Sequence, residues 1–100
     1  AEGITKLCEG LKGSAVTSLR IGINNIGDEG ASALAAVLKE TKITTLGLSW
    51  NNIGDEGAFA LAAVLNETQI TTLNLRDNGL NDQAKRALKD AAGSGVHIQF

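Results

Sequence analysis

A unit of 27 residues recurs in register along the chain, and this repeat constrains the fold more than any other sequence feature. Residues 16–42 and 43–69 are identical at 18 of 27 positions when aligned without a gap. A third, more divergent copy begins at Ile70 with the same spacing. Self-similarity at a fixed period of this size is typical of a repeat array, in which each unit buries its apolar face against its neighbours. We therefore expect a solenoid.

Each unit combines a strand periodicity with a helix periodicity. In the middle copy, Leu46 and Leu48 alternate with small or polar residues, which predicts a short strand with one buried face. Beyond the turn at residues 51–55 the apolar residues fall three and four apart, which predicts a helix. No tight hairpin joins successive strands, so we expect parallel strands connected by helical crossovers.

The turn residues predict how the backbone is held between strand and helix. The helix is expected to start with an aspartate N-cap, Asp55, which Asp28 and Asp82 repeat in the other copies. Three equivalent asparagines should bond the turn backbone with buried amides, and their neighbours should favour the left-handed region. The asparagines are Asn24, Asn51 and Asn78, and the neighbours are Asn25, Asn52 and Gly79. Gly30 and Gly57 should let backbones approach closely.

The chain is expected to form a single domain over residues 1–100. We divide it into a helical half-repeat (1–15), three repeats (16–42, 43–69 and 70–95) and a terminal strand (96–100). Ile98 would match Leu73 if the last return loop, at Gly93 to Gly95, is about two residues shorter than the others.

The motif L-x-x-L-x-L-x-x-N-x-[IL] occurs three times, as VTSLRIGINNI, ITTLGLSWNNI and ITTLNLRDNGL. It resembles the leucine-rich repeat family over essentially the whole chain. The helical half, GDEGAxALAAVL, resembles the ribonuclease-inhibitor-like subclass, which NOD-like receptors also carry, although that subclass usually has a slightly longer repeat. The resemblance implies a right-handed α/β horseshoe segment with a parallel sheet on its concave face and helices on its convex face.

Such repeats mostly bind proteins, so the resemblance also implies a non-catalytic protein-interaction module. The first two copies differ mainly in the strand, where outward positions can vary without disturbing the core. This variation is expected of a recognition surface, and equally of neutral drift on an exposed face. The candidate partner-binding residues are Arg20, Ile23, Ser49, Trp50, Asn74, Arg76 and Asp77. Among them Trp50 has the character of an interface hot spot, or alternatively packs down over Ile23.

Composition argues against several other functions. The net charge is −2, whereas nucleic acid or an anionic membrane would require clustered Lys and Arg. No apolar run is long enough to span a membrane, no signal peptide is visible, and Cys8 is the only cysteine, so we expect a reducing, cytoplasmic location. His97, the only histidine, has no Ser or Cys companion at a readable spacing. We therefore expect no catalytic site, metal or cofactor.

Two alternatives remain open at this stage. The chain could be a fragment of a regulatory leucine-rich-repeat protein, such as a GTPase-activating protein or an innate sensor. It could also self-associate through its ends, because the first helix lacks its own strand and the last strand lacks a following helix.

Overall fold

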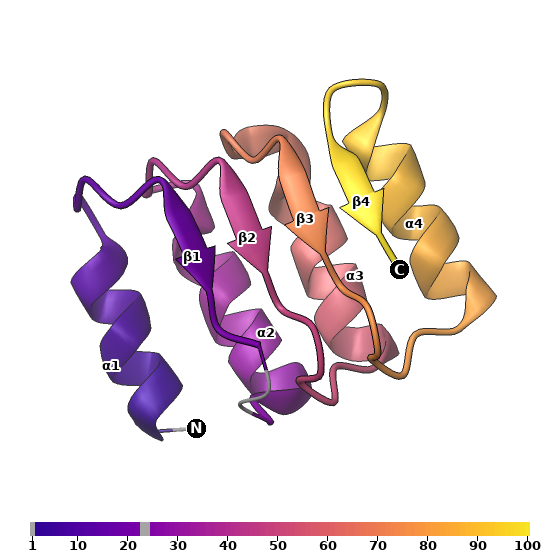
Figure 1. Cartoon of the computed structure of the whole chain (residues 1–100), viewed down its shortest axis with the longest axis horizontal. Coiled ribbons are helices and arrows are strands. Elements are labelled where there is room, and N and C mark those ends of the chain that lie inside the picture. The colour runs from indigo at the N-terminus through magenta and orange to yellow at the C-terminus, as the bar shows by residue number, and fades with distance from the viewer. Residues whose placement is uncertain (1, 23–24) are drawn as a thin grey trace.

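The computed structural model describes residues 2–22 and 25–100 of the chain, and Figure 1 shows helices and strands alternating along it. The helices are α1 (Glu2–Leu11), α2 (Gly27–Leu38), α3 (Asp55–Val64) and α4 (Asp82–Ala92), and a short 3-10 helix, η1 (Leu65–Glu67), follows α3. The strands are β1 (Ser18–Arg20), β2 (Thr45–Gly47), β3 (Thr72–Asn74) and β4 (His97–Gln99).

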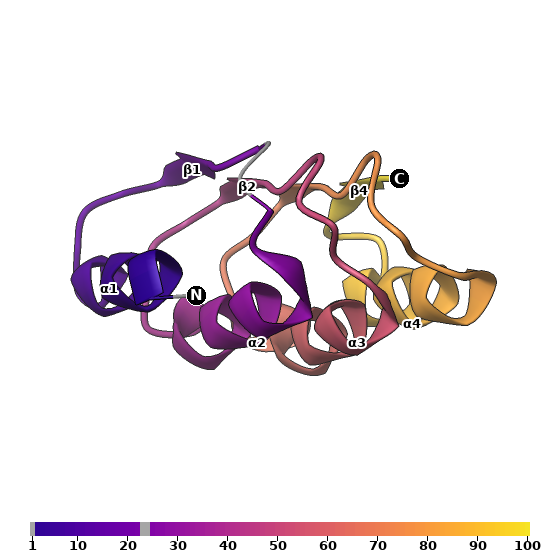
Figure 2. The ribbon, with the colours of Figure 1, turned by 90° about the horizontal axis from the view of Figure 1, so that it is seen from below.

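The four strands form one parallel sheet in the order β1-β2-β3-β4. Leu19 pairs with Leu46 and Leu46 with Leu73, so the register follows the 27-residue repeat. Leu73 pairs with Ile98, which is the shorter offset that the sequence predicts for the last loop. The helices lie in a second layer on one side of the sheet (Figure 2). This architecture confirms the expected α/β solenoid.

The hydrophobic core fills the space between the sheet and the helices. Leu46 and Leu48 point into it from the middle repeat, and Leu61 meets them from α3. Burying a side chain of this size contributes about 1.5–3 kcal/mol to the free energy of folding. Cys8 lies in the same core, at the position that Ala35 occupies one repeat later. Each repeat thus supplies the same apolar positions to one continuous core.

Asparagine amides, buried at Asn51 and half-buried at Asn78, join the turn of one repeat to the backbone of the preceding repeat. The Asn51 amide nitrogen donates to the Ile21 carbonyl (2.9 Å), and its Oδ1 accepts from the N–H of Ile26 (3.3 Å). One repeat further on, Asn78 donates to the Leu48 carbonyl (2.9 Å) and accepts from the N–H groups of Asn51 and Ile53. These contacts confirm the predicted role of Asn51 and Asn78. The third predicted member, Asn24, lies outside the described residues.

The aspartates at the helix starts do not cap their own helices, so that prediction was wrong. Helix α3 begins at Asp55 itself, and its N-cap is Gly54, which has no side chain to cap the helix. The Asp28 carboxylate instead reaches the next repeat, where Oδ1 accepts from the N–H groups of Gly54 (2.7 Å) and Gly57 (2.9 Å). A carboxylate at the start of one helix therefore satisfies N–H groups at the start of the next helix that have no partner within that helix.

The last helix has a different cap from the one predicted. The N-cap of α4 is Asn81, whose side-chain oxygen accepts from the N–H of Ala84 (2.8 Å), and Asp82 is the first helical residue. Asp55 holds this cap from the preceding repeat by accepting from the Asn81 backbone N–H (2.9 Å) and amide nitrogen (2.6 Å). The aspartate and asparagine therefore work as a pair across the repeat boundary.

The left-handed turn residues are partly as predicted. Asn25 (φ 51°) and Asn52 (φ 57°) lie in the left-handed region. Gly79 does not, so the prediction was wrong for the third repeat. There the N–H of Gly79 bonds the Ile53 carbonyl of the preceding repeat (2.8 Å), and the left-handed residue is Asp77 (φ 62°).

Close packing of α2 against α3 requires a glycine at position 57. A Cβ placed on Gly57 would lie 2.9 Å from both the Ala31 Cβ and the Ile53 Cγ2, well inside van der Waals contact. A Cβ on Gly30 would similarly overlap the Ile26 side chain. These distances confirm the expected close approach at both glycines.

Replacing Asn51 with Ala should lower the free energy of unfolding by about 2–4 kcal/mol, because it leaves buried backbone groups of two repeats without partners. Urea denaturation followed by circular dichroism would measure this change. The control is Asn66→Ala, at an exposed residue of η1, which should shift stability by less than about 0.5 kcal/mol. Equal stability of the two variants would contradict a structural role for the asparagine amides.

Gly57→Ala should destabilise the fold by about 1–3 kcal/mol, since the added methyl group overlaps two side chains. Gly10→Ala in α1 is the matched control. A Cβ at Gly10 meets nothing within 4 Å, so this variant should gain about 0.5–1 kcal/mol from helix propensity alone. Thermal melts should show a lower melting temperature than the native chain for Gly57→Ala and a higher one for Gly10→Ala.

Candidate interaction surface

The candidate surface is the sheet face, by which we mean the side of the sheet turned away from the helices. Because successive side chains of a strand alternate, the residues flanking the buried Leu46 turn outwards. The register places Arg20, Gly47, Asn74 and Gln99 in one row across the four strands. In this row the four strands carry different residues at equivalent positions of the sheet.

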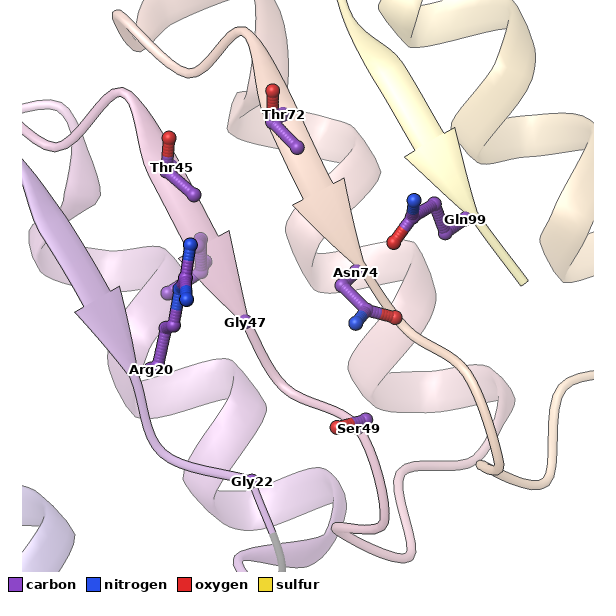
Figure 3. Close-up of a pocket in the computed structure, with 9 residues that line it drawn as sticks. Arg20, Gly22, Thr45, Gly47, Ser49, Thr72, Asn74 and Gln99 are labelled. Carbon is purple, nitrogen blue, oxygen red and sulfur yellow. The ribbon is translucent and has the colours of Figure 1, made fainter.

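A hollow of about 380 Å³ opens on the sheet face around this row (Figure 3). Gly47 leaves space between Arg20 and Asn74 because it has no side chain. The Arg20 side chain lies against it, and a Cβ on Gly47 would come within 3.2 Å of Arg20 Cγ. The described residues that line the hollow are Arg20, Gly22, Thr45, Leu46, Gly47, Ser49, Thr72, Asn74 and Gln99.

Six of the nine lining residues have polar side chains, and the lining comes from all four strands or the segments that follow them. In Figure 3 the Arg20 side chain runs from the end of β1 along β2 towards Thr45, and the Gln99 amide extends from β4 towards β3. The Asn74 Oδ1 accepts a hydrogen bond from the N–H of Arg76 (3.0 Å), which fixes the orientation of this amide. The hollow can therefore offer hydroxyl, amide and guanidinium groups to one ligand.

The structure divides the predicted partner-binding residues into two groups. Arg20, Ser49 and Asn74 line the hollow. Trp50, Arg76 and Asp77 are exposed in the segments that follow β2 and β3, and they do not line it. Ile23, the remaining candidate, lies outside the described residues. A role for any of these residues in binding stays a prediction.

Several lining residues were not among the sequence candidates. Thr45 and Thr72 are the same residue in the second and third repeats and replace the similar Ser18 of the first, so a search for differences between repeats passes over them. Gln99 joins the row only through the shortened last loop, whose register pairs it with Asn74. Gly47 differs from its counterparts, yet its importance lies in the space that it leaves. The hollow could have been found by aligning the terminal strand with the offset of 25 residues.

Trp50 is unusual in both exposure and backbone conformation. Its side chain is 60% exposed, and its φ of 58° lies in the left-handed region, where a bulky residue costs about 1–2 kcal/mol. Its N–H bonds the Arg76 carbonyl of the next repeat (3.1 Å), which holds this conformation in place. The equivalent residue there, Asp77, has the same sign of φ. The fold thus exposes a large aromatic side chain at an energetic cost.

The described residues show few features of metal binding, membrane insertion or thiol chemistry. They contain no group of three or more His, Cys, Asp or Glu side chains placed to hold a metal ion. Their helices lack the length and apolar character needed to cross a bilayer. Burial raises the pKa of the Cys8 thiol, which disfavours the reactive thiolate.

The sequence matches the family described as Leucine Rich repeat at residues 15–35, 39–62 and 68–88, which together make up more than half of the chain. The chain therefore belongs to the leucine-rich repeat family. No curated protein shows significant sequence similarity to it.

One similar solved structure is described as leiomodin-1 actin-binding site 2. It superposes with a TM-score of 0.88 at 20% sequence identity. The match covers 98% of this chain and 61% of the leiomodin-1 chain, so the present chain spans less than two thirds of that neighbour. At this identity the similarity shows the shared fold.

Replacing Trp50 with Gly should give a more stable protein than replacing it with Ala, by about 1 kcal/mol. Both variants remove the indole ring, but only glycine relieves the left-handed conformation. Urea denaturation of the two variants measures the difference. An alanine variant as stable as the glycine variant would mean that the turn relaxes and that Trp50 is not held under strain.

Proposed function

We propose that this chain is a non-catalytic protein–protein interaction module that binds a protein or peptide partner through its sheet face. The observation that carries the proposal is Trp50. Its aromatic side chain is largely exposed, and its backbone is in the left-handed conformation, which is unfavourable for a bulky residue. Aromatic residues with arginine nearby are enriched at interface hot spots. Ser49, directly before Trp50, lines the polar hollow, so an aromatic anchor and a hydrogen-bonding site adjoin each other in the chain.

The proposed contact surface comprises Arg20, Ile23, Ser49, Trp50, Asn74, Arg76 and Asp77, and it requires no cofactor. The family membership supports a binding role by analogy, because a fold alone does not define a partner. We also infer the ribonuclease-inhibitor-like subclass, since full α-helices of 10 to 12 residues form the return halves α2 and α3. A reducing, cytoplasmic location would suit Cys8, which is buried and free.

The test is a pull-down from cell extract with the native chain and two double variants that are first shown to be folded by circular dichroism. Trp50→Ala with Arg76→Ala removes an exposed aromatic and an exposed arginine from the proposed surface. Phe59→Ala with Arg86→Ala is the matched control, because it removes the same kinds of side chain from the exposed side of α3 and α4. We expect a protein that the native chain and the control retain, and that the first variant loses by about tenfold or more.

Two results would contradict the proposal. A partner lost only by the Phe59 and Arg86 variant would place the binding surface on the helices. Retention of further copies of the chain alone would indicate self-association. Purified actin is a defined protein to include, since the structural neighbour is described as an actin-binding site.

A further inference from the structure

We propose that the hollow over Gly47 binds an aspartate or glutamate side chain of the partner. This inference rests on the proposed function, and it adds the chemistry that the partner must present at one position. Three properties of the hollow carry it: its charge, its hydrogen-bond donors and the glycine at its floor.

The positive charge of Arg20 favours an anionic group as the ligand of the hollow. Of the lining residues that the structure describes, only Arg20 is charged. Arg20 is an exposed residue, and within residues 2–22 and 25–100 no carboxylate pairs with its guanidinium. A guanidinium presents a planar fork of N–H groups that matches the two oxygens of a carboxylate. Arg20 is therefore available to bind a carboxylate that arrives with a partner.

The neutral lining residues supply further donors. Ser49 contributes a hydroxyl group from the segment after β2 and Gln99 a side-chain amide from β4, whereas Figure 3 shows the Thr45 and Thr72 hydroxyl groups turned away from Gly47. The oxygen of the Asn74 amide already accepts from the N–H of Arg76, so its NH₂ group is the part left for a ligand. A carboxylate accepts several hydrogen bonds, and such charge-assisted bonds are stronger than those between neutral groups.

Glycine at position 47 has a cost that a bound ligand would explain. Glycine in a strand interior is less stable than other residues, and it often marks a site where a ligand or another backbone approaches closely. A Cβ at position 47 would approach only Arg20 closely, at 3.2 Å from its Cγ, so a side chain there requires a small shift of the flexible Arg20 side chain and no shift of the backbone. A larger residue at position 47 would fill the hollow.

Other occupants fit less well. An apolar side chain would cover the guanidinium and the amide groups without giving them partners, which is unfavourable. A nucleotide or polyphosphate needs several cations, and the described lining offers one. A volume of about 380 Å³ lies near the lower end of small-ligand sites, which suits one or two side chains.

The experiment starts from an unbiased library of short peptides displayed on phage and selected on the native chain. Each selected peptide is synthesised with every acidic residue replaced in turn by its amide, and its affinity is measured by fluorescence anisotropy. We expect one acidic residue whose replacement weakens binding to the native chain by about tenfold or more. The same replacement in the peptide should change its affinity for the Arg20→Gln variant by less than about twofold, because this variant already lacks the guanidinium that binds the carboxylate.

Three further variants separate this site from a general charge effect. Arg86→Gln on α4 changes the net charge equally and should bind like the native chain. Arg20→Lys keeps the charge without the fork and should bind with intermediate affinity. Gly47→Thr should weaken binding by about tenfold or more while its urea midpoint changes little, since the strand preference of threonine offsets the small shift that it requires of the Arg20 side chain.

The proposal is overturned if the selected peptides bind independently of their acidic residues, or if no peptide is retained. It is also overturned if replacing an acidic residue weakens binding to the Arg20→Gln variant as much as binding to the native chain. Peptides that lose affinity for the Trp50 and Arg76 variant, but not for Arg20→Gln or Gly47→Thr, would overturn the carboxylate site and leave the proposed function standing.

Discussion

The hydrogen bonds of the asparagine amides at the strand exits are the interactions on which the rest of this structure depends. The backbone leaves each strand in a tight turn, where some of its N–H and C=O groups pair with the backbone of a neighbouring repeat and others need a side-chain partner. Asn51 and Asn78 satisfy these groups in their own repeat and in the preceding one. A buried unpaired group would cost about 1–3 kcal/mol, so these amides both close the turn and fix the spacing between repeats.

The helix layer is joined by a second set of contacts between repeats. Asp28 and Asp55 bond the start of the following helix, and Gly57 lets α2 and α3 pack closely enough for the Asp28 carboxylate to reach its partners. Each repeat is thus stabilised at two levels by its neighbour. The outward positions of the strands take no part in either set, which leaves the sheet face free to carry different side chains.

Most of the fold could be predicted because the repeat shows which positions are equivalent. The strands, the helices, the buried leucines and the role of Asn51 follow from periodicity and turn chemistry. Helix capping could not be predicted from single repeats, since Asp28 bonds backbone groups 26 and 29 residues further along the chain. Likewise, Arg20, Ser49 and Asn74 stood out as differences between copies, whereas the hollow that they share did not.

The sequence by itself determined the repeat, the alternation of strand and helix, and the apolar positions that must face each other, because these depend on spacing along the chain. Only the tertiary structure decided which aspartate meets which helix start, the left-handed conformation and exposure of Trp50, and the hollow over Gly47. These features depend on how neighbouring repeats are placed in space. In particular, the glycine at position 47 leaves a hollow only because the side chains on either side of it, Arg20 and Asn74, come from neighbouring strands.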